Sequence, residues 1–146
     1  MRCNLSNVMV YFQLYADDFP LDVITKRLGL KPTKSYKKGD IIKKIDRITN
    51  HVRNYTSWQL RTDYQESFNV GELIEQVIRQ IREKTQIINE LKREFSLECR
   101  FTIVIEIING ISPGFHLDND VIEFANSIQA DFDVDLYSYS NDEEKE

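Results

Sequence analysis

The chain has 146 residues, of which 41% are hydrophobic and 29% are charged, and its mean hydropathy is -0.45. We expect one soluble domain over residues 1–139 and an acidic tail over 140–146. Three prolines and five glycines exclude collagen-like and low-complexity chains. The N-terminal residues lack the apolar segment and cleavage site of a secretory signal, so we expect a cytoplasmic protein with no membrane partner.

Charge is distributed unevenly along the chain. Residues 1–100 carry 18 Lys and Arg against 13 Asp and Glu, whereas residues 101–146 carry 1 against 11. The basic residues concentrate in 31–55, which hold eight against two acidic ones. We therefore expect an electrostatic dipole with a basic segment and an acidic C-terminal third.

The first part of the chain predicts a strand, a helix and a second strand. Residues 8–15 are rich in β-branched and aromatic side chains with apolar residues at every second position, which is typical of a strand. Pro20 suits the first turn of a helix, and Gly29 suits its C-terminal end, where a left-handed residue is needed. Residues 33–38 predict a short strand that Gly39 ends by supplying a positive φ.

Residues 40–54 are polar and basic, with isoleucines interspersed. They predict either a flexible basic insertion or a short, weakly pairing helix, and the residue pattern leaves both open. The alternation in residues 55–62 predicts a further strand, in which Trp58 points toward the core.

The second part predicts two helices and two strands. Apolar residues at spacings of three and four follow Asn69, which is a candidate N-terminal cap, and predict a helix. If this helix is unbroken up to residue 93, it is about 36 Å long. Residues 97–108 are apolar on both faces, as in a central strand. A helix over 117–130, capped by Asp118 or Asn119, precedes a last strand over 132–137.

The predicted element order is β-α-β-β-α-β followed by α-β. The first six elements match the ferredoxin-like, or split β-α-β, arrangement. We therefore predict an α+β fold with a ferredoxin-like core, an added α-β unit, and a mostly antiparallel sheet covered by helices.

Several short segments in this order resemble a known family. They are Phe12-Gln13-Leu14-Tyr15, Asp18-Phe19, Leu28-Gly29-Leu30-Lys31-Pro32-Thr33, Tyr36-Lys37-Lys38-Gly39-Asp40, Ser57-Trp58 and Asp133-Val134-Asp135-Leu136-Tyr137. Together they resemble the bacterial family called domain of unknown function 4279 over nearly the whole chain. The resemblance implies a compact α+β domain and a bacterial source, and it implies no activity or substrate. The basic stretch between Gly39 and Tyr55 departs from the family pattern.

Catalytic and metal-binding patterns are scarce in this sequence. His51 and His116 are the two histidines, and neither has a second ligand at a metal-binding spacing. Cys3 and Cys99 lie too far apart for a zinc ribbon, and neither lies near a histidine in the sequence. We predict a protein that is not an enzyme and that holds no metal and no cofactor.

Two surfaces are candidates for binding a partner. Asp131, Asp133, Asp135 and Tyr137 alternate with apolar residues in the last predicted strand, which gives an acidic surface suited to a cationic partner. The alternative is a basic and aromatic surface of Lys34, Tyr36, Lys37, Lys38, Lys43 and Lys44, as in proteins that bind single-stranded nucleic acid. Gly29, Gly39 and Trp58 are expected to have structural roles.

We predict a domain that binds another macromolecule, with an immunity or antitoxin protein that neutralises a co-encoded bacterial toxin as its concrete form. The alternatives are a small-molecule-binding or regulatory ferredoxin-like domain and a nucleic-acid binder through residues 31–55. Apolar residues between 70 and 91 also approximate a heptad pattern. A homodimer through the helix over 70–93 is therefore a further prediction.

Overall fold

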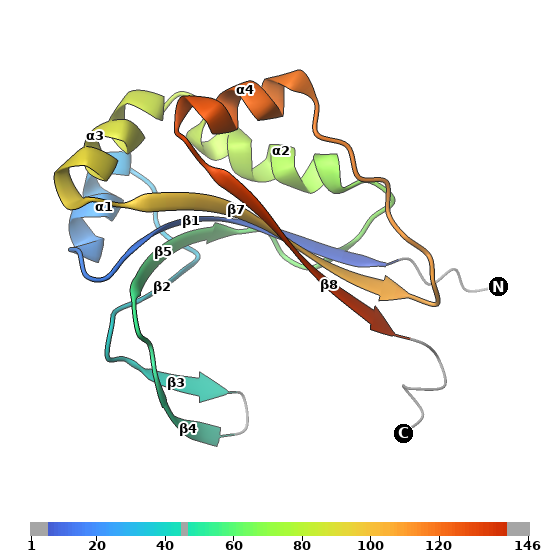
Figure 1. Cartoon of the computed structure of the whole chain (residues 1–146), viewed down its shortest axis with the longest axis horizontal. Coiled ribbons are helices and arrows are strands. Elements are labelled where there is room, and N and C mark those ends of the chain that lie inside the picture. Colours follow the sequence, from blue (N-terminus) through green and yellow to red (C-terminus); the bar gives the residue numbers. More distant parts are fainter. Residues whose placement is uncertain (1–5, 45–46, 140–146) are drawn as a thin grey trace.

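A twisted sheet lies beneath a layer of helices in the computed structural model, which describes residues 6–44 and 47–139 (Figure 1). The elements are β1 (Asn7–Ala16), α1 (Leu21–Leu28), β2 (Lys34–Tyr36), β3 (Ile41–Lys44), β4 (Arg47–Val52), β5 (Thr56–Arg61), β6 (Gln65–Glu66), α2 (Val70–Ile81), α3 (Thr85–Phe95), β7 (Glu98–Ile108), α4 (Asn119–Ser127) and β8 (Asp131–Tyr139). The predicted acidic tail over 140–146 and Cys3 lie outside the described residues.

The main sheet is mostly antiparallel, as predicted. Its strands follow the order β2-β5-β1-β7-β8, and the short β6 also pairs with β1. The pairs β2–β5, β5–β1 and β1–β7 are antiparallel, whereas β8 lies parallel to β7 because α4 connects them as a crossover. The chain therefore has a mixed α+β fold, with β8 as an edge strand.

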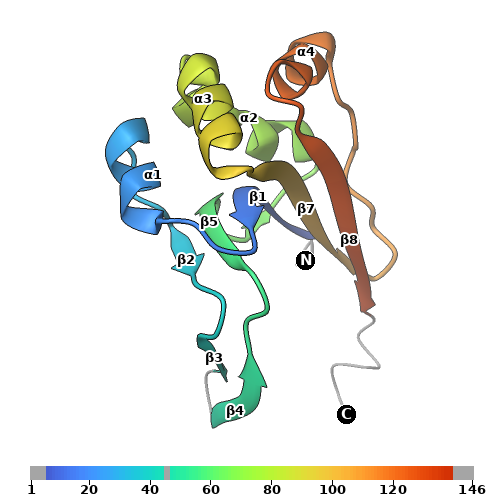
Figure 2. The same ribbon diagram turned by 60° about the vertical axis from the view of Figure 1, so that its left-hand side comes forward.

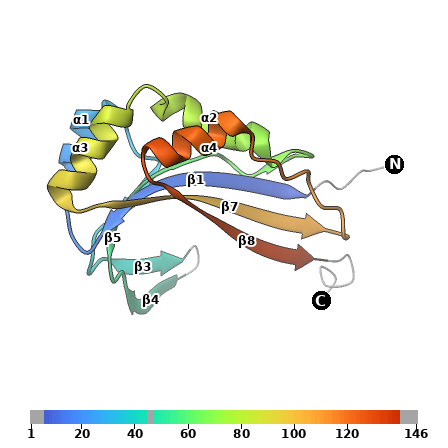
Figure 3. The same cartoon turned by 45° about the horizontal axis from the view of Figure 1, so that its top comes forward.

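The hydrophobic core lies between one face of this sheet and the helices (Figure 3). Successive side chains of a strand point to opposite faces, so Val8, Val10, Phe12 and Leu14 of β1 all face the helices and are fully buried. Trp58 of β5 also points inward, as predicted, with none of its surface exposed. Its indole Nε1 donates a hydrogen bond to Thr25 Oγ1 of α1 at 3.0 Å.

The helix ends confirm several predicted caps. Gly29 has a left-handed φ of 67° and its N–H donates to Thr25 O at 2.9 Å. Asn69 and Asp118 cap α2 and α4, and their side-chain oxygens accept hydrogen bonds from the backbone N–H groups of Gly71 and Val121 at 2.9 Å. Gly39 has the expected positive φ, 93°.

The prediction of one unbroken helix from residue 69 to 93 is wrong. The chain forms α2 and α3, separated by a turn in which Lys84 N donates to Ile81 O at 2.9 Å. A straight rod of about 36 Å would leave the twisted sheet, whereas the turn lets α3 pack beside α1. Arg27 of α1 pairs there with Glu90 and Glu94 of α3.

The apolar stripe that suggested a homodimer belongs to the core of one chain. The stripe is buried along both helices, with Val70, Leu73, Ile74, Val77, Ile78, Ile81, Ile88 and Leu91 at 1% exposure or less. Self-association through residues 70–93 stays a prediction, and it would have to use the polar side chains of α2 and α3.

The prediction of a short helix within residues 40–54 is wrong, because the described residues of this segment form a β-hairpin of β3 and β4. That the segment is a flexible basic insertion stays a prediction. The hairpin extends away from β2 and β5 on the side of the sheet opposite the helices (Figure 2). A turn anchors its base, since Gly39 N donates to Arg53 O and Arg53 N donates to Asp40 O, both at 2.8 Å. Isoleucine is β-branched and favours strands, but the isoleucines at positions 41, 42, 45 and 48 do not alternate, so the sequence shows no period of two here.

Within the described residues, no helix is both long enough and apolar enough to cross a membrane.

Candidate functional site

The face of the main sheet opposite the helices carries the strongest concentration of functional side chains. We call it the open face, because no helix of the described chain lies on it (Figure 3). The strand pairing places on it Tyr11, Gln13 and Tyr15 of β1, Lys34 and Tyr36 of β2, Ser57, Gln59 and Arg61 of β5, Arg100 and Thr102 of β7, and Asp131, Asp133 and Asp135 of β8.

Three arginines each lie over a tyrosine ring on the open face. The guanidinium carbon of Arg53 lies 3.9 Å from the ring centroid of Tyr36. Arg61 lies 4.5 Å from the ring of Tyr11, and Arg100 lies 5.2 Å from that of Tyr15. These distances are within the range of cation–π interactions. Among the described residues, none of the three guanidinium groups lies in an ion pair.

Beneath these stacks runs a buried hydrogen-bond network across β1 and β5. Ser57 Oγ accepts from Gln13 Nε2 at 3.0 Å and from Gln59 Nε2 at 2.9 Å. Gln59 Oε1 in turn accepts from Arg61 Nε at 2.7 Å. These three polar residues are at most 5% exposed although no helix covers them. The network therefore fixes the orientation of Arg61 on a rigid part of the sheet.

A tyrosine pair joins this network to the base of the hairpin. The hydroxyl of Tyr36 donates to that of Tyr55 at 2.5 Å, and their rings meet edge to face at 5.4 Å. Tyr55 also lies edge-on to Tyr15 at 6.1 Å. Burial, followed by the hydrogen bond with Tyr55, raises the pKa of Tyr36 above its usual value. Tyr36 therefore keeps its proton, and its hydrogen bond to Tyr55, at physiological pH.

The predicted acidic surface forms one margin of the open face. Asp131, Asp133 and Asp135 lie opposite Arg100, Thr102 and Val104 in the parallel pairing of β8 with β7. Tyr137 follows opposite Glu106 and is 49% exposed. These residues lie on an edge strand beside the Arg100–Tyr15 stack.

The six residues of the predicted basic and aromatic surface do not form one continuous strand surface, because they lie on β2, in the turn after it and on β3. Lys37 and Lys38 lie in the turn after β2 and pair with Asp18 at 3.2 Å and Asp17 at 2.7 Å. Lys34 and Tyr36 lie on β2, whereas Lys43 and Lys44 lie on β3 of the hairpin. Lys34, Tyr36 and Lys43 line one cavity of about 510 Å³ together with Ser35, Asp40, Ile41 and Arg53.

A second cavity, of about 500 Å³, lies at the end of the open face where β1 ends. Its lining includes Gln13, Tyr15, Tyr55, Glu98 and Arg100. Burial and the nearby Glu98 raise the pKa of Tyr15, while Arg100 opposes this shift. The cavity combines aromatic rings with one cationic group, Arg100, and two anionic groups, Asp17 and Glu98.

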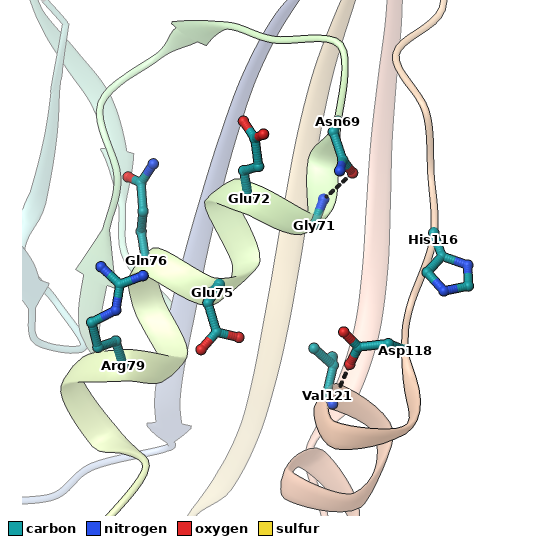
Figure 4. Close-up of a pocket in the computed structure, with 9 residues that line it drawn as sticks. All are labelled: Asn69, Gly71, Glu72, Glu75, Gln76, Arg79, His116, Asp118 and Val121. Carbon is teal, nitrogen blue, oxygen red and sulfur yellow. Dashed lines mark hydrogen bonds between the residues drawn. The ribbon is translucent and has the colours of Figure 1, made fainter.

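A third cavity, of about 510 Å³, lies on the helical side between α2 and the segment leading into α4 (Figure 4). Its polar lining includes Glu72, Glu75 and Arg79 of α2 with His116 and Asp118. Asp118 already accepts the backbone N–H of Val121, so it serves as a helix cap. The described residues hold no group of three or more His, Cys, Asp or Glu able to bind a metal ion.

The remaining candidates for catalysis lie apart from one another. His51 lies on the hairpin strand β4 and His116 lies in the loop before α4, whereas Cys99 is buried on β7 at 2% exposure. Burial raises the pKa of the Cys99 thiol, which disfavours the reactive thiolate. That the chain is not an enzyme stays a prediction.

The sequence reasoning missed Arg53, Arg61 and Arg100, together with Tyr11 and Gln13. Arg61, Arg100, Tyr11 and Gln13 lie at alternate positions of a strand, and Arg53 lies directly after β4. The signal was available, because polar and aromatic residues alternate with the apolar set of β1. Only the strand order, however, places Arg61 and Arg100 on one face, and the contact with the Tyr36 ring adds Arg53 to it.

Comparison with known proteins agrees with the resemblance seen in the sequence. A family model described as Domain of unknown function (DUF4279) matches residues 6–139, which is most of the chain. No curated protein and no solved structure matches this chain. The chain therefore belongs to the DUF4279 family.

Proposed function

We propose that the chain is a non-enzymatic protein-binding domain whose partner docks on the open face. The observation that carries this proposal is the set of three arginines stacked on tyrosines beside an acidic edge strand. Tyrosine and arginine dominate the residues that supply binding energy in protein interfaces. Stacked on rigid strands, these side chains lose little conformational freedom when a partner binds.

The charge of the open face favours a protein over a nucleic acid. Cationic Lys34, Arg53 and Arg61 lie toward β2 and β5, whereas Asp131 and Asp133 lie on β8 at the opposite edge. A phosphate backbone crossing this face would meet carboxylates, which repel it. A protein surface presents both signs of charge and can match the two edges.

The concrete form that we propose is a bacterial immunity or antitoxin protein that neutralises a co-encoded toxin in the cytoplasm. Asp131, Asp133, Asp135 and Tyr137 would meet a basic surface of the toxin. Their alternation along β8 places the three carboxylates on one face, which supports this assignment. Complementary charge would accelerate association at low salt.

We also propose that β1, α1, β2, β5, the pair α2 and α3, and β7 form a ferredoxin-like core. The strand order β2-β5-β1-β7 supports this, since it is the order of a split β-α-β unit. In this interpretation the hairpin of β3 and β4 is an insertion, and α4 with β8 is the added unit.

A small-molecule-binding domain is the second candidate function. The cavity lined by Gln13, Tyr15, Tyr55 and Arg100 favours it, because about 500 Å³ suits a small organic ligand. This candidate predicts that a low-molecular-weight fraction, rather than a protein, stabilises the chain.

The two candidates are separated by affinity capture with matched charge variants. Three tagged proteins are used to capture partners from lysate of the source organism. They are the wild-type chain, an Asp133→Lys/Asp135→Lys variant and a Glu83→Lys/Glu123→Lys control. The control changes the net charge by the same amount on exposed positions of the helical side. Thermal unfolding of all three proteins establishes that each is folded.

We expect one protein in stoichiometric amount with the wild type and the control, with and without nuclease treatment. The Asp133→Lys/Asp135→Lys variant should capture at least about tenfold less of this protein, which corresponds to a loss of about 1.4 kcal/mol in binding free energy. Equal retention by all three proteins contradicts docking at β8. Recovery that disappears with nuclease contradicts a protein partner, and stabilisation by a small-molecule extract alone favours the second candidate.

A further inference from the structure

We propose that the cavity between β2, β3 and the segment before β5 binds a compact phosphate-bearing anion through Lys34, Lys43 and Arg53. This site lies at the β2 edge of the open face, away from the acidic strand β8, and binding of the anion there needs no protein partner. The phosphate belongs to a small phosphate ester or a pyrophosphate.

The first support is the charge of the cavity. The cavity has a volume of about 510 Å³, and its lining holds three cations, Lys34, Lys43 and Arg53, and one carboxylate, Asp40. This set leaves a formal charge of +2, which matches a phosphate monoester that carries about -1.5 to -2 at pH 7. A single carboxylate ligand would neutralise half of this charge.

The second support is that, among the described residues, no carboxylate forms an ion pair with Lys34, Lys43 or Arg53. By contrast, Lys37 and Lys38 of the same segment are both paired with aspartates. Asp40 has a structural role, since its Oδ2 accepts the backbone N–H of Lys37 at 2.8 Å. The lining therefore concentrates like charges that a bound anion would neutralise.

The electrostatics of Lys34 agree with this crowding. Burial lowers the pKa of Lys34, and the positive charges of Arg61 and Arg53 lower it further. Like charges close enough to perturb one another destabilise the free protein unless an anion lies between them. Such an arrangement is typical of binding sites rather than of passive surface.

The third support is that Arg53 is held in place without using its donors. Its guanidinium lies 3.9 Å from the centroid of the Tyr36 ring, and Tyr36 is fixed by its hydrogen bond to Tyr55 at 2.5 Å. Its backbone N–H donates to Asp40 O at 2.8 Å. No side-chain hydrogen bond of Arg53 occurs within the described part of the chain. With respect to the described residues, its N–H groups are therefore available for the paired hydrogen bonds that phosphate oxygens accept.

The test is isothermal titration calorimetry of the full chain with inorganic pyrophosphate at constant ionic strength. The variants Lys34→Gln and Arg53→Gln remove charge from the cavity. The control Lys37→Gln/Lys38→Gln removes charge from the paired lysines of the same segment, which lie outside the lining. A single-stranded oligonucleotide serves as the second probe.

We expect saturable binding of one pyrophosphate per chain. Each cavity variant should weaken it at least about tenfold, because it removes a cation that would donate charge-assisted hydrogen bonds to the phosphate oxygens. The control should change it less than about twofold, because Lys37 and Lys38 are paired with Asp18 and Asp17 and their exposed charges are screened by salt. Lys34→Gln keeps the Arg53–Tyr36 stack, so it tests the site even if Arg53→Gln perturbs the hairpin.

Three results would overturn the proposal. They are the absence of saturation up to about 10 mM pyrophosphate, equal weakening by the control, and binding of the oligonucleotide without binding of pyrophosphate. Loss of pyrophosphate binding in the cavity variants with capture of a protein partner unchanged would separate this site from docking at β8.

Discussion

The hydroxyl oxygens of Tyr36 on β2 and Tyr55 before β5 lie 2.5 Å apart, beneath the guanidinium of Arg53. This contact joins the main sheet to the base of the hairpin. It couples the geometry of the proposed anion site to the protonation of a buried phenol, because an ionised Tyr36 could no longer donate this hydrogen bond.

Alkaline pH is expected to destabilise the protein through Tyr36. The pKa of Tyr36 is raised in the folded chain, so the folded state keeps a proton that the unfolded chain releases above its ordinary value of 10.0. This stability is complete below pH 10.0 and is lost as the pH rises above it. Urea unfolding between pH 9 and 11.5 should show a fall of at most about 1.4 kcal/mol for each pH unit from this group.

Tyr36→Phe should flatten this dependence, although it lowers stability at neutral pH by removing the hydrogen bond to Tyr55. Tyr137→Phe is the matched control, because Tyr137 is 49% exposed on the edge strand. The same alkaline slope in wild type and Tyr36→Phe would contradict the assignment.

Ser57→Ala should destabilise the open face. Ser57 Oγ accepts from the amides of Gln13 and Gln59, and both donors are buried. Leaving them without an acceptor costs about 1–3 kcal/mol, measured as a shift of the urea midpoint at unchanged slope. Ser35→Ala, at an exposed position of β2, should have an effect within about 0.5 kcal/mol. Equal effects of the two substitutions would refute the network.

Trp58→Phe should lower the stability by about 2 kcal/mol. The indole is fully buried and donates to Thr25 Oγ1, so the substitution leaves a small cavity and an unpaired hydroxyl. Thr25→Val combined with Trp58→Phe should be less destabilising than the sum of the single variants, since both remove the same bond. Strict additivity in this double-mutant cycle would show that the bond contributes nothing.

Gly29→Ala should lower the thermal midpoint through backbone strain alone. Gly29 has a φ of 67°, and a Cβ placed there meets no atom within 4 Å. The expected loss is about 1 kcal/mol, the usual penalty for a side chain in the left-handed region. Gly29→Asn should lose less, because asparagine tolerates this conformation. An equal loss for both substitutions would point to a different cause.

The elements that depend on local pattern were predictable. The alternation of Val8, Val10, Phe12 and Leu14 identified β1 and its buried face. Pro20 and Gly29 bounded α1, because their backbone preferences hold in any tertiary context. The split between α2 and α3 was not predictable in this way, since helical spacing continues across the turn and only the need to cover a twisted sheet breaks it.

Local residue patterns are enough to identify the buried faces of β1, β5 and the helices, the ends of most helices, and the segregation of charge along the chain. The tertiary structure decided which charges meet. It paired Lys37 and Lys38 with Asp18 and Asp17, left Lys34 and Arg53 to line a cavity, and stacked Arg53, Arg61 and Arg100 on tyrosines. Periodicity reports the face on which a side chain lies, whereas its neighbours across the sheet depend on strand order and register, which are set by contacts distant in sequence.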